Sequence, residues 1–301
     1  MEYYFEINGR KIFTEVLGAD NAPAILYIHG GPGAGSFDFR VHQGDRLSRF
    51  CKLIMVDQRG VLRSQYLEES DLICPRDIVE DFEEIRRRLN IKSWSILGHS
   101  FGGYLALLYN NLYPKVIDKI IFECPTFDFA LSARSLIARA AEEFRDMGHE
   151  EKAQECEQAV LSYKDTRDIW YKMSLLNELG ERRNNLYVFH EEKDFFENLV
   201  RSSGLSDEIW SREQLHSNKL DEDGSVYYSA MPLLQNINCP ALMINGKYDY
   251  VTSIEQIEEF RKKVSLGTVI EFNKSGHFPR FEEAELYTET IECFLLKNKL
   301  F

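Results

Sequence analysis

The segment LGHSFGG places Ser100 between Gly98 and Gly102. An apolar run typical of a buried strand, SWSIL, comes before it, and a pattern typical of a helix, FGGYLALLYNNLYP, follows. A serine at a sharp turn from strand to helix holds its hydroxyl above the sheet, and flanking glycines relieve the crowding between the two elements. Without that context the same pattern is only a helix start rich in small residues. With it, the sequence predicts a nucleophile at Ser100.

A serine hydroxyl attacks a carbonyl only when a base takes its proton, so a histidine and an acid are needed. His277, in NKSGHFPRFEE, follows the last apolar run of the chain. Asp249, in INGKYDYV, follows the apolar run PALMI and gives the chain order serine, aspartate, histidine. Glu123 is the rival acid, because it also ends a predicted strand. We favour Asp249 as the acid and His277 as the base.

A glycine-rich loop, HGGPGAGS at 29–36, follows the apolar run AILYI. Such a loop either cradles a phosphate or presents backbone N–H groups to a developing oxyanion. A phosphate loop would need a G-x-G-x-x-G fingerprint that opens a helix, or a G-K-[ST] ending, and the segment has neither. We therefore predict an oxyanion hole formed by the backbone N–H groups of Gly31 and Phe101.

The elements that must hold these residues alternate between strand and helix. EYYFEI and RKIFTEVLG flank Asn8-Gly9, which predicts a hairpin. APAILYIHGG and CKLIMVDQRG are typical of strands buried on both faces of a parallel sheet, and apolar spacing over 77–90 predicts a helix. The expected fold is α/β, with a mostly parallel, doubly wound central sheet flanked by helices.

This alternation stops between Thr126 and Met231, where proline is absent and helical spacing dominates. We predict a core domain formed by residues 1–127 and 232–301 and a helical cap inserted at 128–231. PALMING and TVIEFNKSGH then return to strands. In the helix expected between them, Ser253 and Gln256 have the spacing of a capping box.

The composition limits the partners of the chain. Its 301 residues, 44% of them hydrophobic, are enough for a large core. A formal charge of −13 argues against nucleic acid and anionic membrane surfaces as partners, because both are polyanions. We expect a cytoplasmic protein, since no leader pattern opens the sequence and no run approaches the roughly 20 apolar residues of a membrane span. Six dispersed cysteines without a C-x-x-C pair indicate no zinc site, so we expect no metal and no cofactor.

Five segments together resemble the proline iminopeptidase family of α/β-hydrolases. They are HGGPG at 29–33, DQRG at 57–60, GHSFGG at 98–103, GKYDYV at 246–251 and SGH at 275–277. The resemblance covers almost the whole chain, although the insertion matches only in being helical. It implies an α/β-hydrolase fold with a helical cap, and a cytosolic serine hydrolase that removes an N-terminal residue, often proline, from short peptides without a metal.

Three positions depart from the pattern of that family. The nucleophile lies in His99-Ser100-Phe101, where the family's aminopeptidases usually have Gly-Gly-Ser followed by Trp or Tyr. Leu62 stands where DQRGxGxS has its second glycine, and Tyr250 follows the proposed acid where related aminopeptidases can have a glutamate. Exopeptidase specificity is therefore less well supported by the sequence than the hydrolase class.

An exopeptidase needs a negative charge near the free amine of its substrate, because a desolvated ammonium without a partner is costly. The insertion supplies acidic and aromatic side chains for such a site. The candidate substrate contacts are Glu123, Glu191, Glu192 and Trp210. The expected substrate is accordingly a small molecule or a short peptide.

Two other functions stay open at this point. The same triad would serve a carboxylesterase, a lactonase or a carbon–carbon bond hydrolase acting on small molecules. The fold would also serve a non-catalytic small-molecule receptor, although a complete triad argues against that function. The sequence predicts no oligomeric state.

Overall fold

The computed structural model describes residues 1–162, 164–189 and 195–296. These residues form one eight-stranded sheet with the order β1-β2-β4-β3-β5-β6-β7-β8. The strands are β1 (Glu2–Ile7), β2 (Arg10–Leu17), β3 (Ala24–Ile28), β4 (Lys52–Val56), β5 (Trp94–His99), β6 (Ile117–Glu123), β7 (Ala241–Gly246) and β8 (Gly267–Phe272). Pairing is parallel from β4 to β8 and antiparallel at β1 and β2, which confirms the mostly parallel sheet.

The hairpin expected at the start of the chain is present. β1 and β2 pair in register from Ile7 and Arg10 outward, and Asn8 and Gly9 between them have φ values of 49° and 76°. Two consecutive left-handed residues are what a tight two-residue hairpin turn requires, and asparagine followed by glycine adopts them at low cost.

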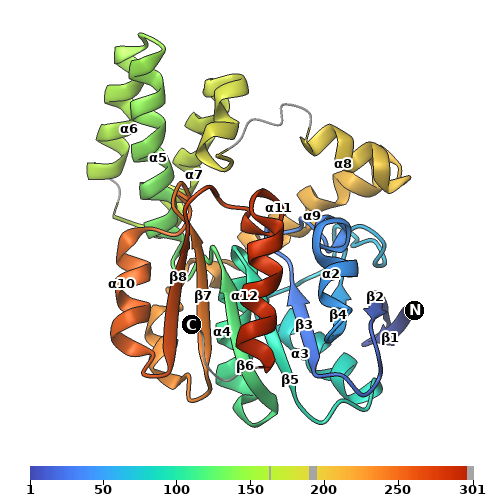
Figure 1. Ribbon diagram of the computed structural model, residues 1–301. Helices are drawn as coiled ribbons and strands as arrows, with labels where there is room; N and C mark the ends of the chain where they lie inside the picture. The colour runs from blue at the N-terminus through green and yellow to red at the C-terminus, as the bar shows by residue number, and fades with distance from the viewer. Residues whose placement is uncertain (163, 190–194, 297–301) are drawn as a thin grey trace.

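Helices cover both faces of the sheet. The core helices are α1 (Phe37–Phe39), η1 (Arg40–Gly44), α2 (Asp45–Leu47), α3 (Pro75–Arg88), α4 (Phe101–Leu112), η2 (Pro114–Val116), η5 (Met231–Asn236), α10 (Ile254–Lys263), α11 (Pro279–Glu282) and α12 (Ala284–Leu296). Side chains alternate along β3: Leu26 and Ile28 belong to the hydrophobic cluster that includes residues of α3, α4 and α10, whereas Ile25 and Tyr27 belong to the cluster that includes residues of α12, which crosses in front of the sheet in Figure 1. Because the side chains on both faces are buried, the sequence of the strand is a continuous apolar run.

The chain between β6 and β7 forms a group of helices that we call the cap. It contains α5 (Phe129–Asp146), α6 (Glu150–Ser162), α7 (Thr166–Tyr171), η3 (Lys172–Leu186), α8 (Phe195–Ser203), α9 (Asp207–Asp223) and η4 (Ser225–Tyr227). Figure 1 shows these helices together at one end of the sheet. Helices α5, α6, α7 and η3 share a hydrophobic cluster, which includes Leu136, Phe144 and Leu176 and extends to Val251 of the core.

Helix α9 is bound to the core by one of its faces. Arg212 donates to the carbonyl of Leu62 (2.9 Å), His216 Nδ1 donates to that of Arg59 (2.7 Å), and Lys219 donates to that of Glu69 (2.6 Å). The three side chains recur at intervals of four and three residues, so they line one side of the helix. The core segment after β4 therefore holds α9 in place.

The predicted capping box of α10 is wrong. Ser253 is the N-cap residue, but its side chain makes no cap hydrogen bond. Gln256 is buried and turns instead toward the entrance of the cap, where its Oε1 accepts from the backbone N–H groups of Phe127 (2.6 Å) and Asp128 (3.1 Å). Tertiary contacts thus override the local cap, because these two N–H groups need an acceptor in the interior.

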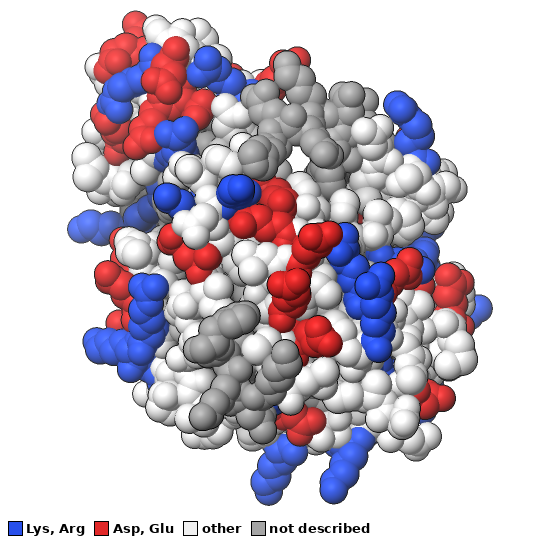
Figure 2. All heavy atoms as spheres, in the orientation of Figure 1, with Lys and Arg blue, Asp and Glu red and all other residues white. Residues whose placement is uncertain are grey.

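Charged side chains of both signs are interspersed over the face shown in Figure 2. Across 1–162, 164–189 and 195–296, none of the helices is both long and apolar enough to cross a lipid bilayer.

The first prediction concerns Gln256. We expect Gln256→Ala to lower the free energy of unfolding by about 2 to 4 kcal/mol in urea denaturation, because two backbone N–H groups lose their acceptor. Gln154→Ala is the control, since Gln154 bonds to Glu150 on the exposed side of α6, and we expect it to change stability by less than about 0.5 kcal/mol. Equal losses in the two variants would contradict the assignment.

Candidate active site

Ser100 lies at the turn between β5, which ends at His99, and α4, which begins at Phe101. Its φ of 54° and ψ of −121° fall outside the ordinary regions for a residue with a side chain, which costs of order 1–3 kcal/mol. Hydrogen bonds hold the turn: the N–H of Ser100 donates to the carbonyl of Glu123 (3.0 Å), and its own carbonyl accepts from Gly103 (2.8 Å) and Thr126 (3.0 Å). The surrounding strands therefore maintain the strain at the proposed nucleophile.

The glycines around Ser100 are required by close backbone contacts. A Cβ at Gly98 would clash with the carbonyl of Gly102, and one at Gly102 would clash with the carbonyl of Ile28. A Cβ at Gly30 would lie 2.8 Å from that of Ser100. The glycine-rich loop after β3 thus packs directly against the turn that carries Ser100, as an oxyanion loop must.

The structure brings the predicted base and acid together. His277 Nδ1 and Asp249 Oδ1 are 3.0 Å apart, and the carboxylate also accepts from the backbone N–H groups of Val251 (2.9 Å) and Thr252 (3.2 Å). Burial alone would raise the pKa of Asp249, but the attraction of His277 and these hydrogen bonds hold that pKa below 3.8. Asp249 is therefore ionised at neutral pH and keeps the proton of the imidazole on Nδ1.

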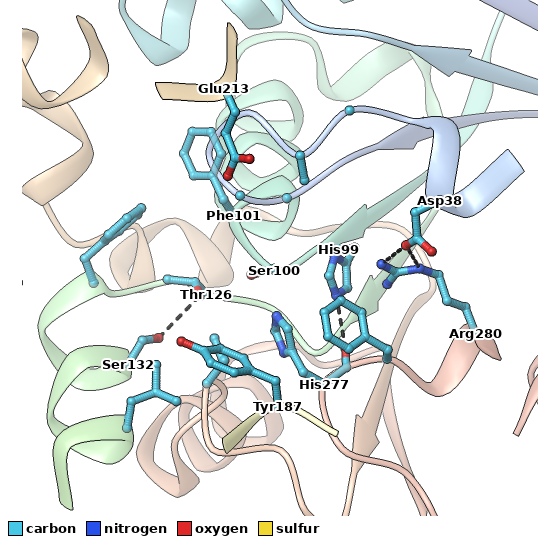
Figure 3. Close-up of a pocket in the computed structure, with 18 of the residues that line it drawn as sticks. Asp38, His99, Ser100, Phe101, Thr126, Ser132, Tyr187, Glu213, His277 and Arg280 are labelled. Atoms are coloured by element: carbon cyan, nitrogen blue, oxygen red, sulfur yellow. Dashed lines mark hydrogen bonds and ion pairs between the residues drawn. The ribbon is translucent and has the colours of Figure 1, made fainter. Parts of the chain in front are cut away.

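Ser100 and His277 both line one cavity, into which the imidazole projects in Figure 3. His99 holds the backbone of His277. Its Nε2 donates to the backbone carbonyl of His277 (3.0 Å), and the two rings lie 4.7 Å apart. Burial, together with Arg280, holds the pKa of His99 well below 6.5, so this imidazole is neutral.

Glu123 does not reach the cavity, which contradicts its prediction as a substrate contact and as the rival acid. The residue is 0% exposed, and its carboxylate accepts from Arg280 (3.2 Å) and from the Tyr287 hydroxyl (3.0 Å). Arg280 also donates to Asp38 (2.7 Å), whose carboxylate lies at the edge of the cavity in Figure 3. Glu123 instead neutralises a buried arginine just after His277 in the chain.

Cap and core side chains together enclose the cavity, which holds about 1,100 Å³ including its opening to solvent. Trp210, a predicted substrate contact, does line it, whereas Glu191 and Glu192 lie outside the described residues. Most of the wall is apolar. It includes Phe101, Phe129, Leu136, Trp170, Met173, Leu199, Trp210 and Val251. A small molecule or a short peptide fits a chamber of this size.

Glu213 is a lining residue that the sequence did not single out. It lies on α9, beside the bound face described above, and contacts Gly33 of the glycine-rich loop. Figure 3 shows its carboxylate pointing into the cavity near Phe101. In the sequence this glutamate looks like one more charge on a polar helix, so no local signal distinguishes it.

One group of side chains has the composition of a metal site. Within the described part of the chain, Cys124, Asp249 and His277 offer ligand atoms that all lie within 4.8 Å of one another. Two of them form the acid–base pair, and burial raises the pKa of the Cys124 thiol well above 9, so the thiol keeps its proton. The group offers three ligands, fewer than a structural zinc site needs, and we assign no metal to it.

Comparison with known proteins assigns the chain to a family. The model of the alpha/beta hydrolase fold matches residues 23–284. The chain belongs to the α/β-hydrolase family. Two solved structures share the fold of this hydrolase. A proline iminopeptidase-related protein from Thermus thermophilus is 21% identical, with a TM-score of 0.71 over 97% of this chain and 95% of that chain. An esterase from Exiguobacterium antarcticum is 20% identical, with a TM-score of 0.68 over 98% of this chain and 99% of that chain.

Two sequence relatives of the hydrolase are named as proline iminopeptidases. The proline iminopeptidase of Heyndrickxia coagulans is 23% identical over 300 residues, which cover 98% of each chain. A Mycoplasma genitalium protein assigned to the proline iminopeptidases is 39% identical, but only over 116 residues. That match spans 38% of this chain and 36% of the relative, about a third of its length.

Two departures from the family pattern have structural explanations. Leu62 has a φ of 40°. The backbone at this position is therefore left-handed, the conformation that glycine favours, although the residue is a leucine. Its side chain fills the space next to Gly35. Tyr250, next to the acid, packs under the guanidinium of Arg139 from the cap (5.1 Å).

The second prediction tests the packing at Ser100. We expect Gly102→Ala to destabilise this hydrolase by more than about 3 kcal/mol, because the new Cβ meets the backbone carbonyl of Ile28, which cannot give way. Gly9→Ala, at an open hairpin position with φ of 76°, should cost only about 1 kcal/mol from backbone strain. Chemical denaturation compares the two, and a Gly102→Ala variant as stable as Gly9→Ala would refute the tight turn.

Proposed function

We propose that this α/β-hydrolase is a serine hydrolase that acts through an acyl-enzyme, most specifically an aminopeptidase of the proline iminopeptidase type. The observation that carries the proposal is the strained Ser100 facing the same cavity as an imidazole whose other nitrogen is bound to Asp249. Strain of this kind persists only where the surrounding structure enforces it, and it is typical of active sites.

The roles of the three residues follow from their protonation. Because the proton of His277 stays on Nδ1, its Nε2 carries the lone pair that takes the proton of Ser100 during attack on a carbonyl carbon. The resulting imidazolium is stabilised by the ionised Asp249 and then protonates the leaving group. Water, deprotonated by the same imidazole, hydrolyses the acyl-enzyme and restores Ser100.

The oxyanion would form at the start of α4. Phe101 is the first residue of that helix, so its N–H has no partner within the helix and carries the positive end of the helix dipole. Gly31 belongs to the loop that Gly30 brings against Ser100. Two preorganised N–H groups at this point would stabilise the negative oxygen that develops in the transition state.

The third prediction tests the nucleophile. Ser100→Ala should lower kcat on the best aryl ester or arylamide by at least about 1,000-fold, because no other group can form the acyl-enzyme. It should also abolish labelling by a fluorophosphonate while the circular dichroism spectrum and Tm stay close to those of the parent. Labelling of the alanine variant at the parental rate would refute the role of Ser100, and a wild type that resists labelling would favour a receptor.

Glu213 supports the aminopeptidase specificity. It projects into a largely apolar cavity that also contains Ser100, and among the described residues no hydrogen bond or ion pair engages its carboxylate. Burial raises the pKa of Glu213 above 4.5, and Arg183 offsets only part of that rise. Glu213 as a whole is exposed, so water reaches its carboxylate in the free protein, and a bound ligand that displaces this water would have to supply a positive charge in its place.

The free ammonium of a peptide N-terminus is a ligand of that kind. It would pair with Glu213 while the carbonyl of the same residue lies at Ser100, and the aromatic and aliphatic wall would take the side chain. The relatives named proline iminopeptidases are consistent with this substrate class. An ester that lacks an amine would displace water from this carboxylate without supplying a charge, which is our reason for preferring aminoacyl substrates.

The fourth prediction separates the two substrate classes. Glu213→Gln should lower kcat/KM for proline, alanine or leucine arylamides by about 30- to 100-fold, because the ammonium loses a charged partner, and leave short aryl esters within about threefold of the parent. Glu208→Gln, in the exposed first turn of the same helix, is the matched control and should change neither activity. Equal losses on amides and esters would contradict the amine site.

The raised pKa of Glu213 also predicts an effect on stability. The folded protein binds this proton more tightly than the unfolded chain, so the contribution of Glu213 to stability falls as pH rises through its raised pKa. Because Glu213 is exposed, solvent screens most of this effect, so the ionised carboxylate costs only a little stability at neutral pH, and Glu213→Gln should raise Tm slightly at pH 7 but have little effect near pH 4. A lower Tm at pH 7 would show that Glu213 is a structural residue.

A further inference from the structure

The segment Tyr187–Phe189, which follows η3 in the cap, is hydrogen-bonded to the loop that carries His277. The backbone N–H of His277 donates to the carbonyl of Tyr187 (2.6 Å), and their rings make an edge contact at 6.1 Å. Figure 3 shows the two side chains next to each other. Gly276 makes this approach possible, since a Cβ there would clash with the same carbonyl. The backbone of the proposed base is thus fixed by the cap as well as by the core.

Glu282 joins the same two segments through its side chain. Its Oε1 accepts from the N–H of Phe189 in the cap (2.6 Å), and its Oε2 accepts from the N–H of Gly276, next to His277 (2.7 Å). A carboxylate is suited to this bridge because both of its oxygens accept hydrogen bonds, whereas a glutamine would direct an N–H₂ group at one of the two donors.

Phe189 reaches the acid side of the site as well. Its ring stacks on that of Tyr248 at 4.1 Å, and Tyr248 is the residue before Asp249 in the chain. The bridged cap segment therefore contacts the loop of the base and the loop of the acid. Neither Phe189 nor Glu282 is among the residues that line the cavity, so both lie outside the substrate chamber.

Glu283, the next residue, provides an internal comparison. Its Oε2 accepts from the N–H of Lys274 (2.9 Å) and from the hydroxyl of Ser275 (2.7 Å). Both bonds anchor the His277 loop, but both partners belong to the core. Glu282 and Glu283 thus hold the same loop, and Glu282 in addition joins that loop to the cap.

We propose that Glu282 is a positioning residue that couples the place of the cap segment Tyr187–Phe189 to the alignment of His277. When the segment is seated, the bridge and the Tyr187 carbonyl hold the backbone of His277 so that its Nε2 faces Ser100. When the segment shifts, the N–H of His277 loses the Tyr187 carbonyl, Glu282 loses the N–H of Phe189, and the base moves. This inference rests on the proposed function, because it assumes that His277 is the base.

The central experiment compares Glu282→Gln with Glu283→Gln in the full chain. Glu282→Gln should lower kcat on an aryl ester, and the rate of fluorophosphonate labelling, by at least about tenfold, because a misplacement of about 1 Å in a catalytic group has effects of this size. KM should stay within about twofold, since Glu282 lies outside the chamber. Glu283→Gln should lower the same rates by less than about threefold. Equal losses, or a loss in KM alone, would overturn the proposal.

A second pair of variants tests the cap side of the bridge. Phe189→Pro removes the ring and the N–H that Glu282 accepts, whereas Phe189→Ala removes only the ring. Phe189→Pro should therefore lose more activity than Phe189→Ala, and it should add little to the loss already present in Glu282→Gln, because both changes break one interaction. Losses from Phe189→Pro and Glu282→Gln that simply multiply would contradict the bridge.

Hydrogen–deuterium exchange supplies a readout that does not depend on activity. Glu282→Gln should speed exchange in peptides that cover 187–189 and 274–280 together, whereas Glu283→Gln should affect only 274–280. Exchange confined to 274–280 in both variants would overturn the coupling even if Ser100 proves not to be the nucleophile. Conversely, coupled exchange in a protein that no fluorophosphonate labels would leave the bridge standing and refute the proposed function.

Discussion

The backbone of Ser100 has to turn from β5 into α4 at a φ of 54°, and the packing around it follows from that turn. A turn this sharp brings the first residues of α4 against β3, so Gly102 meets the carbonyl of Ile28 and leaves no space for a side chain. It also brings the glycine-rich loop against Ser100 itself. The N–H of Ser100 then needs an acceptor, which β6 supplies through the carbonyl of Glu123. Contacts from the neighbouring strands and loops thus stabilise the strained backbone of Ser100.

Charges around the site fall into two classes. Glu123, Arg280 and Asp38 neutralise one another beside the loop of His277, and Asp249 is held ionised by His277 and by backbone N–H groups. These groups are satisfied in the free protein, so they stabilise its geometry. Glu213 is the exception, because its carboxylate projects into the cavity and its pKa is raised by burial. Glu213 is also exposed, so its carboxylate is hydrated in the free protein and is accessible to a cation that enters the cavity.

Two of the places where the cap is bound to the core adjoin the site. On one side, α9 bonds to the segment after β4 and presses Glu213 against Gly33 of the glycine-rich loop. On the other side, the segment Tyr187–Phe189 bonds to the backbone around His277. The cap therefore contributes both to the walls of the chamber and to the support of the proposed base. Tyr187 belongs to both, because it lines the cavity and its carbonyl accepts from the N–H of His277.

Local patterns in the sequence were sufficient for the hairpin, the parallel strands and the turn at Ser100, because each depends on the backbone preferences and burial of neighbouring residues. Carboxyl ends of parallel strands meet at one edge of a sheet, so the convergence of Ser100, Asp249 and His277 could also be predicted. Other features depend on pairs of residues far apart in the chain. Glu123 ends a strand as Asp249 nearly does, yet only the folded protein shows that Arg280 lies against Glu123. Gln256 likewise bonds to Phe127 instead of capping its own helix. Glu213 lines the cavity only because α9 packs on the glycine-rich loop. Propensity acts along the chain and determined the elements, whereas burial and charge pairing act across space and were decided by the tertiary structure.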